Sequence, residues 1–268
     1  MTALIQRGIT SGILIVWGIL LTYFYSSGRV SAYLSPTFQP WTLAAGLMLL
    51  ILSVIVWFSP STVTSGDAPS LAKGLGGTIF SGVVLTIPLV LATIVSPSQF
   101  SASTVLNRGL VSDANSLPGY KPPVEPALPT QDGTPGQDIA TNPYMPRNAD
   151  GQIRAETIDL IYAAEEKSLR ADFENKEVEM IGQFMPAKSN NAKGDRFSLV
   201  RMYMVCCAAD ARPTAVTVQM DPAVKMEEMS WVRVVGTATF PVEGGRVIPL
   251  VVAKTVKPSD PPEEAMIY

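Results

Sequence analysis

The sequence predicts a membrane protein with transmembrane α-helices and a C-terminal mainly-β domain, an OB-like five-stranded barrel. Long uncharged apolar runs fill the first third of the chain, a Pro- and Gly-rich stretch follows, and the remainder alternates apolar and polar residues over short segments. The 268 residues are 47% hydrophobic and only 16% charged, which is more apolar than an ordinary soluble protein. The expected parts are a three-span anchor (1–96), a linker (97–152) and the barrel (153–268).

Three apolar runs are each about long enough to cross a bilayer core, which takes roughly 17–25 helical residues. They are Ile9–Tyr25, Trp41–Phe58 and Gly77–Val95, and none contains Asp, Glu, Lys or Arg. A signal peptide or a buried core helix would explain one such run but not three. Because a transport path usually carries an ionisable group at membrane depth, we expect these helices to form an anchor or a docking surface.

The charges that flank the runs suggest an orientation. Arg7, the terminal amine and Lys73 lie on one side of the predicted spans, whereas Arg29 and Arg108 lie on the other. By the positive-inside rule, the side with more positive charges faces the cytoplasm. The terminal amine gives the side of Arg7 and Lys73 that excess, so a cytoplasmic amino terminus is favoured. With three spans, everything after Val95 is expected outside the cytoplasm.

Ser96 to Gly151 shows little helical or strand periodicity. Its prolines and glycines, with few apolar residues, predict an extended tether that buries little surface. The pattern changes after it. Apolar residues at helical spacing, with charged residues opposite, predict one amphipathic helix over Glu156–Arg170.

Five short segments in the last part of the chain have the apolar alternation of strands. They are Glu177–Met185, Phe197–Cys207, Thr214–Met220, Ser230–Phe240 and Val247–Val256. Asp-Pro opens a predicted short helix over Asp221–Met229, and Gly244-Gly245 predicts a hairpin turn between the last two strands. Five strands with a helix between the third and fourth are typical of an OB-like barrel, in which closure removes the exposed sheet edges.

Charge and composition exclude several functions. The net charge is −3, and residues 153–268 hold 14 Lys plus Arg against 17 Asp plus Glu, so no basic groove for nucleic acid is expected. The chain contains no His, which removes Ser-His-Asp and Cys-His catalysis, and it has no P-loop or dinucleotide-binding glycine motif. We therefore expect a protein that is not an enzyme.

The two cysteines of the chain, Cys206 and Cys207, are adjacent, and Asp210 follows three positions later. In a regular strand they would face opposite sides, so that one could be core. They could also form a strained disulfide with each other, bridge other chains, or give thiolates to a soft metal together with Asp210. A closed zinc site needs four ligands, and a chain without His is short of them. Arg201 could pair with Asp210 and hold this segment.

The position of the pair along the chain predicts that it is accessible. The block from Ala208 to Pro213 interrupts the strand pattern, and Pro213 cannot donate to a strand ladder. The cysteines are therefore expected at the end of a strand, near a rim of the barrel. At least one thiol should then be reachable by solvent.

The motif Arg201…Cys206-Cys207-Ala-Ala-Asp210-Ala211 resembles the signature of the YcgQ-like family of uncharacterised bacterial membrane proteins. These proteins are typically encoded beside a predicted permease. The resemblance extends along most of the chain, including Trp231–Gly236. It implies a bacterial cell membrane, a partner permease and a link to metal homeostasis, with zinc as the usual suggestion. Many members have a His- and Cys-rich stretch between the second and third spans, whereas Ser59–Gly76 contains neither residue.

The expected function is therefore that of a non-enzymatic, membrane-anchored accessory subunit of a permease. Its partners would be the permease and the lipid bilayer. Cys206, Cys207 and Asp210 are the candidate ligands or contact residues, with Arg201 in support, and zinc is the candidate ion. Two alternatives remain open: a thiol redox protein that cycles the cysteine pair, and a purely structural membrane adaptor.

Overall fold

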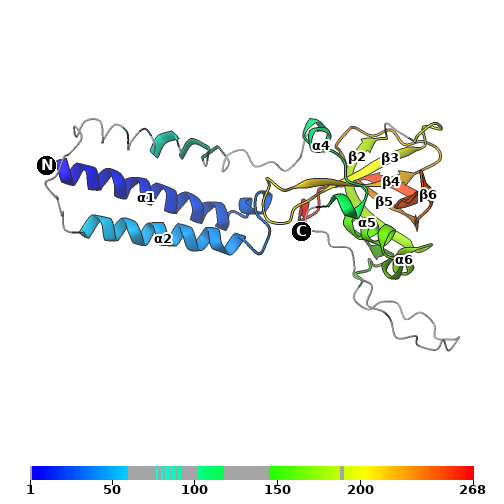
Figure 1. The fold of residues 1–268 in the computed structure, drawn as a ribbon, viewed down its shortest axis with the longest axis horizontal. Helices are drawn as coiled ribbons and strands as arrows, with labels where there is room; N and C mark the ends of the chain where they lie inside the picture. The colour runs from blue at the N-terminus through cyan, green and yellow to red at the C-terminus, as the bar shows by residue number, and fades with distance from the viewer. Residues whose placement is uncertain are drawn as a thin grey trace, which may run out of the picture. The chain divides into compact units, whose positions relative to one another are not determined.

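The computed structural model describes residues 2–59, 77, 80, 82–84, 86–88, 90, 91, 102–117, 145–187 and 190–268. By its internal contacts the chain forms two units. The first comprises residues 1–98 together with Cys206–Ala208, and the second holds the rest. Figure 1 shows long helices in the first unit and a sheet with shorter helices in the second.

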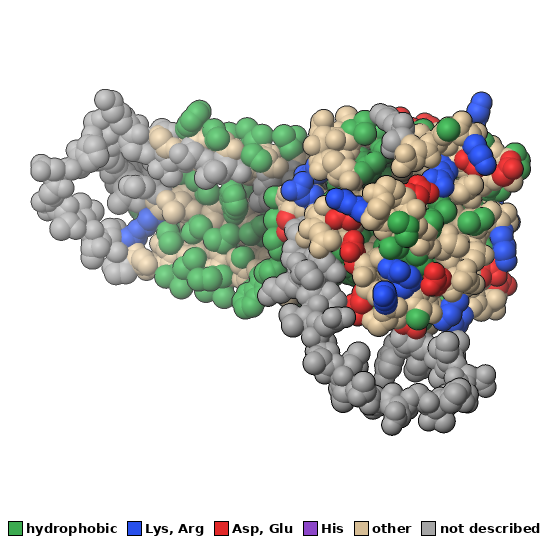
Figure 2. All heavy atoms as spheres, turned by 45° about the vertical axis from the view of Figure 1, so that its right-hand side comes forward, with side chains coloured by type: hydrophobic (Ala, Val, Ile, Leu, Met, Phe, Trp, Pro, Cys, Tyr) green, Lys and Arg blue, Asp and Glu red, His purple; other side chains and the backbone are tan. Residues whose placement is uncertain are grey.

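The first unit is built on two long apolar helices, α1 (Thr2–Ser26) and α2 (Gln39–Phe58), with the short 3-10 helix η1 (Arg29–Ala32) after α1. By length and composition, Arg7–Ser26 and Gln39–Phe58 could each cross a membrane. The first two predicted runs are therefore confirmed as helices of spanning length. Their outer surface is apolar, as the hydrophobic side chains over the helices in Figure 2 show.

Small and polar residues lie where α1 and α2 meet. A Cβ atom on Gly18 would lie 2.7 Å from the Leu50 side chain, and one on Gly46 would lie 3.1 Å from the Gly18 carbonyl oxygen. The buried Ser11 hydroxyl donates to the Ser53 carbonyl at 3.1 Å. Close backbone approach and interhelical hydrogen bonds are the features that hold helices together where apolar burial offers little gain.

The third predicted run, Gly77–Val95, is described only in part. Residues 77, 80, 82–84, 86–88, 90 and 91 are helical, and its other residues lie outside those that the structure describes. Trp17 Nε1 donates to Thr86 Oγ1 at 2.9 Å, which ties this segment to α1. The helices of spanning length among the described residues are α1 and α2, so the three-span arrangement stays a prediction.

The segment expected to be a linker contains ordered elements where it is described. These are α4 (Ala102–Arg108) and the 3-10 helix η2 (Ala114–Ser116). Val105, Ala114 and Leu117 are buried in apolar clusters of the second unit. These side chains pack the segment into the second unit. The many prolines and glycines around them made this packing hard to predict from the sequence. Residues 97–101 and 118–144 lie outside the described part of the chain.

Two helices stand where one was predicted. After the short strand β1 (Ile153–Arg154), α5 covers Thr157–Glu165 and α6 covers Lys167–Phe173. The single helix over Glu156–Arg170 is thus wrong. The Arg170 guanidinium reaches back to the carbonyls of Ala163 and Ala164, with Nε 3.1 Å from the Ala163 oxygen. These donors satisfy carbonyls that the end of α5 leaves without helical partners.

Five strands form a closed barrel. They are β2 (Glu177–Pro186), β3 (Arg196–Tyr203), β4 (Arg212–Gln219), β5 (Trp231–Thr239) and β8 (Leu250–Pro258). Their order is β2-β5-β8-β4-β3, and β3 pairs back with β2 to close the ring. The strand β1 adds to β2, and β9 (Met266–Ile267) adds to β3, both in parallel. The five predicted strands and their closure are confirmed.

The barrel core follows from the alternation in the strands. Val178, Val216, Val218, Val232 and Val234 have no exposed surface and belong to one cluster. On β5, a Cβ atom at position 236 would lie 2.4 Å from the Val252 carbonyl oxygen, in the backbone of β8. Only glycine fits at this point, where the register of the two strands also shifts.

One local prediction in the barrel is wrong, and another is confirmed. Asp221–Met229 is not a helix, because its end is fixed to β2: Met229 N donates to the Phe184 carbonyl at 2.7 Å, and Gln183 Nε2 donates to the Met229 carbonyl at 3.1 Å. The predicted turn at Gly244-Gly245 is confirmed: both residues have positive φ, 57° and 78°, at the tip of the small hairpin of β6 (Val242–Glu243) and β7 (Arg246–Val247), which lies between β5 and its antiparallel neighbour β8 in the chain. Because the helices of this unit precede the barrel strands, the OB-like character stays a prediction.

Candidate functional site

The loop between β3 and β4 carries both cysteines. β3 ends at Tyr203, four residues before the predicted end at Cys207. Beyond it, the Asp210 Oδ1 atom accepts a hydrogen bond of 3.0 Å from Val205 N, which closes the loop across its base. The cysteines thus lie past the end of a strand, as the interrupted pattern after Val205 predicts.

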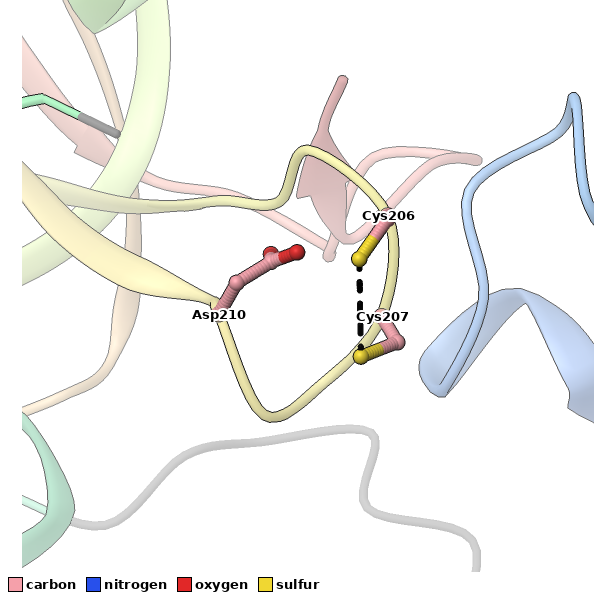
Figure 3. Close-up of side chains that lie close together, drawn as sticks. All are labelled: Cys206, Cys207 and Asp210. Carbon is pink, nitrogen blue, oxygen red and sulfur yellow. Dashed lines mark hydrogen bonds between the residues drawn. The ribbon is translucent and has the colours of Figure 1, made fainter. Parts of the chain in front are cut away.

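The side chains of Cys206, Cys207 and Asp210 converge (Figure 3). One ligand atom from each residue lies within 4.8 Å of the other two. The two Sγ atoms are 3.7 Å apart and joined by a thiol hydrogen bond, and both cysteines are free. All three residues are half-buried, so neither thiol belongs to the fully buried core.

The backbone around the cysteines is hydrogen-bonded within the first unit, to which Cys206–Ala208 belong. Ser35 N donates to the Cys206 carbonyl at 3.1 Å, and Ala208 N donates to the Tyr33 carbonyl at 2.8 Å. These two bonds frame an antiparallel bridge between Leu34 and Cys207. The backbone is therefore fixed on both sides of Cys207, and the thiols are positioned before any ligand arrives.

Arg201 does not pair with Asp210 as predicted. It is only 2% exposed, and its Nη1 lies 3.1 Å from Glu156 Oε2. Nη1 also donates to the Ile181 carbonyl, and Nη2 donates to the Glu264 carbonyl at 2.8 Å. The guanidinium also stacks over the Trp231 ring at 5.6 Å. Arg201 thus supports the barrel interior and does not hold the cysteine loop.

Glu156 is the residue that the sequence analysis missed. It caps α5, and its backbone N–H donates to Asp159 Oδ2 at 2.8 Å. Burial raises the pKa of Glu156 even though Arg201 opposes the shift, and burial likewise raises the pKa of Asp159. The sequence did offer one sign that such a carboxylate exists, namely Arg201. An arginine inside a buried strand requires a partner.

Two family models match the chain, one over its N-terminal part and one over its C-terminal part. A family model described as the DUF1980 N-terminal domain matches residues 9–111, and one described as the DUF1980 C-terminal domain matches residues 154–268. No curated protein matches the chain significantly. The YcgQ name and the pairing with a permease stay predictions. Since the two models together cover most of the sequence, in the order expected, the chain belongs to the DUF1980 family.

Proposed function

We propose that this protein is a non-enzymatic, membrane-anchored accessory subunit of a permease, and that its Cys206–Cys207–Asp210 loop binds a metal ion. The observation that carries the proposal is the convergence of two thiols and a carboxylate within 4.8 Å in one short loop. The apolar helices α1 and α2 support the membrane anchor. The proposal that the partner is a permease rests on the resemblance to the YcgQ-like family.

The donor set fits zinc. Two thiolates at the usual Zn–S distance of about 2.3 Å, at a tetrahedral angle, would have their sulfurs about 3.8 Å apart. The Sγ atoms of Cys206 and Cys207 are 3.7 Å apart. Sulfur ligands also disfavour Mg²⁺ and Ca²⁺, which prefer oxygen.

Three protein ligands leave one tetrahedral position for water or an incoming ligand. Structural zinc sites are closed by four protein ligands, whereas open sites exchange the fourth ligand. An open site suits an ion that is received and passed on, as an accessory protein of a metal permease would require. In this role the ion is cargo, and the chain supplies two thiolates, a carboxylate and a fixed backbone.

The barrel is proposed to lie outside the cytoplasm. The proposal rests on the charges that flank the apolar runs and on a third span. A reporter that fluoresces only in the cytoplasm, fused after Tyr268, would then stay dark. A bright fusion would reverse the orientation.

The test of metal binding is the zinc content of the full chain, purified in detergent with a tag that binds no metal. We expect about one zinc per chain, loss of zinc in the double variant Cys206→Ser with Cys207→Ser, and weaker binding in Asp210→Asn. Asp260→Asn, in an exposed segment, is the matched control and should bind as the parent does. Equal zinc content in the parent and in the double serine variant would overturn the proposal.

The second candidate is a thiol redox protein, favoured by the same Sγ–Sγ separation of 3.7 Å. Exchange with an external disulfide would join the two sulfurs and reduce that partner to two thiols. Mass spectrometry after alkylation separates the two functions. A reversible loss of both alkylation sites under mild oxidation, in protein that binds no zinc, would favour redox cycling. Thiols that neither bind zinc nor oxidise would leave a structural adaptor.

A further inference from the structure

A cavity of about 620 Å³ opens in the side of the barrel, where β2 and β3 separate. The two strands pair only from Gln183 opposite Val200 to Pro186 opposite Phe197. From Met202 onward, β3 pairs with β9 instead. Arg201 stands at this divergence and donates to the carbonyl of Ile181, the last-but-one residue of β2 before the pairing begins.

The cavity has the character of a small-molecule site. Its volume falls within the range of about 300–1,000 Å³ that such sites occupy. Met145, Ile153, Phe173 and Ile181 give it an apolar wall. A few charged groups converge on it, which is the combination that positions a ligand and selects for it.

Two of these charged groups have atoms without hydrogen-bond partners among the described residues. Arg201 Nε has no hydrogen-bond partner among the described residues, and the buried Glu156 Oε2 atom is held only by its ion pair with Arg201 Nη1 at 3.1 Å. One is a donor on a cation, and the other is an acceptor on an anion. Buried polar atoms in folded proteins are nearly always satisfied, so a donor without a partner beside a carboxylate oxygen held only by an ion pair points to a further polar ligand.

Of the other charged groups on the wall, Asp159 accepts from Glu156 N at 2.8 Å, and the rest form ion pairs. Glu179 lies 3.6 Å from Arg154 and 3.0 Å from Arg233. Asn148 donates to the same carboxylate at 3.1 Å. Arg201 and Glu156 are therefore the charged groups of the cavity that have an atom without a hydrogen bond among the described residues.

The charges on the wall cancel. Arg154, Arg201 and Arg233 stand against Glu156, Asp159 and Glu179. A net anion would suit Arg201 Nε and be repelled by Glu156, and a net cation would suit Glu156 and be repelled by Arg201. A ligand that is neutral overall, but carries a separated carboxylate and ammonium, satisfies both.

We propose that this cavity binds a free α-amino acid with an apolar side chain. Its carboxylate would accept from Arg201 Nε, its ammonium would donate to Glu156 Oε2, and its side chain would lie against Ile153 and Phe173. This assignment does not depend on the cysteine loop. Burial lowers the pKa of Arg201 and raises that of Glu156, although the charge of each residue opposes the shift of the other.

The test is binding of L-methionine, L-leucine and L-phenylalanine to the full chain in detergent, followed by titration calorimetry. At least one should bind saturably. Its N-acetyl form, which lacks the ammonium, and its carboxamide form, which lacks the carboxylate, should each bind at least about tenfold more weakly. Absence of saturable binding by all three up to about 10 mM, or equal binding of a blocked form, would overturn the proposal.

A matched pair of variants places the ligand in the cavity. Glu156→Gln keeps the shape of the side chain and should weaken binding at least about tenfold. Glu243→Gln removes the same charge from a different ion pair, with Arg196, outside the cavity, and should leave binding unchanged. If Glu156→Gln binds the amino acid as the parent does, the proposal is wrong. If Glu156→Gln fails to fold, the N-acetyl and carboxamide amino acids still test the proposal on the parent chain.

Discussion

The α1–α2 pair and the barrel distribute polar and apolar side chains in opposite ways. The barrel buries residues such as Val232 and Val234 and carries Lys, Arg, Asp and Glu on its surface (Figure 2). In α2, Met48 is 62% exposed and Phe58 is 78% exposed, whereas Ser53 is buried against α1. The barrel thus exposes charged side chains, whereas α2 exposes apolar ones, as expected of a helix that could cross a membrane.

This difference indicates that different forces hold the two parts together. In the barrel, removal of apolar surface from water is the main favourable term. In a bilayer that term would be small for α1 and α2, so tight packing at Gly18 and Gly46 and the Ser11 hydrogen bond would matter more there. Substitutions of the same kind should therefore have different effects in the two parts.

The largest effect is expected for Val234→Asp, which puts a carboxylate into the barrel core. The unfolding free energy should fall by more than about 4 kcal/mol, because the charge has no partner there. The matched control Val242→Asp, at a position that is 69% exposed, should change it by less than about 0.5 kcal/mol. Thermal unfolding of the full chain measures both. Similar losses in the two variants would mean that the barrel interior is not the stabilising core.

The next effect concerns α2. Met48 lies near the middle of the helix with its side chain exposed, so Met48→Asp should raise the free energy of membrane insertion by about 3 kcal/mol. Met48→Leu is the control and should insert normally. The measurement is the fraction of chain that stays in the membrane after alkaline extraction. An aspartate variant that inserts as well as the leucine variant would contradict a lipid-facing α2.

The smallest effect is a pH dependence in the barrel unit. Because burial raises the pKa of Glu156 above its ordinary 4.5, the folded protein binds that proton more tightly than the unfolded chain. The stability that this proton adds to the folded protein is fully present below about pH 4.5. It is lost as the pH rises through the raised pKa of the folded state. The decline should be shallower in Glu156→Gln, with a remainder from Asp159, whose pKa is also raised. The check is the unfolding midpoint against pH, and parallel curves for parent and variant would contradict it.

The features that the sequence predicted correctly are local. Strand alternation marks the barrel because each strand buries one face, and the break in the pattern after Val205 marks the cysteines as lying past the end of β3. The Arg201–Glu156 pair joins a strand to a helix cap far away in the chain, so no spacing rule reveals it. The predicted helix over Asp221–Met229 rested on its Asp-Pro start, whereas hydrogen bonds from β2 decide its conformation.

Closure of the barrel limits the ways in which a partner can be recognised. Many protein complexes form by β-augmentation, in which a segment of one partner adds as a new strand to a free sheet edge of the other. In the described part of the chain, β2 and β3 pair with each other, and the strands added beside them, β1 and β9, are only two residues long. A permease or any other partner would therefore find little edge to extend. In the proposed complex, recognition would depend on side chains, loops or the apolar helices.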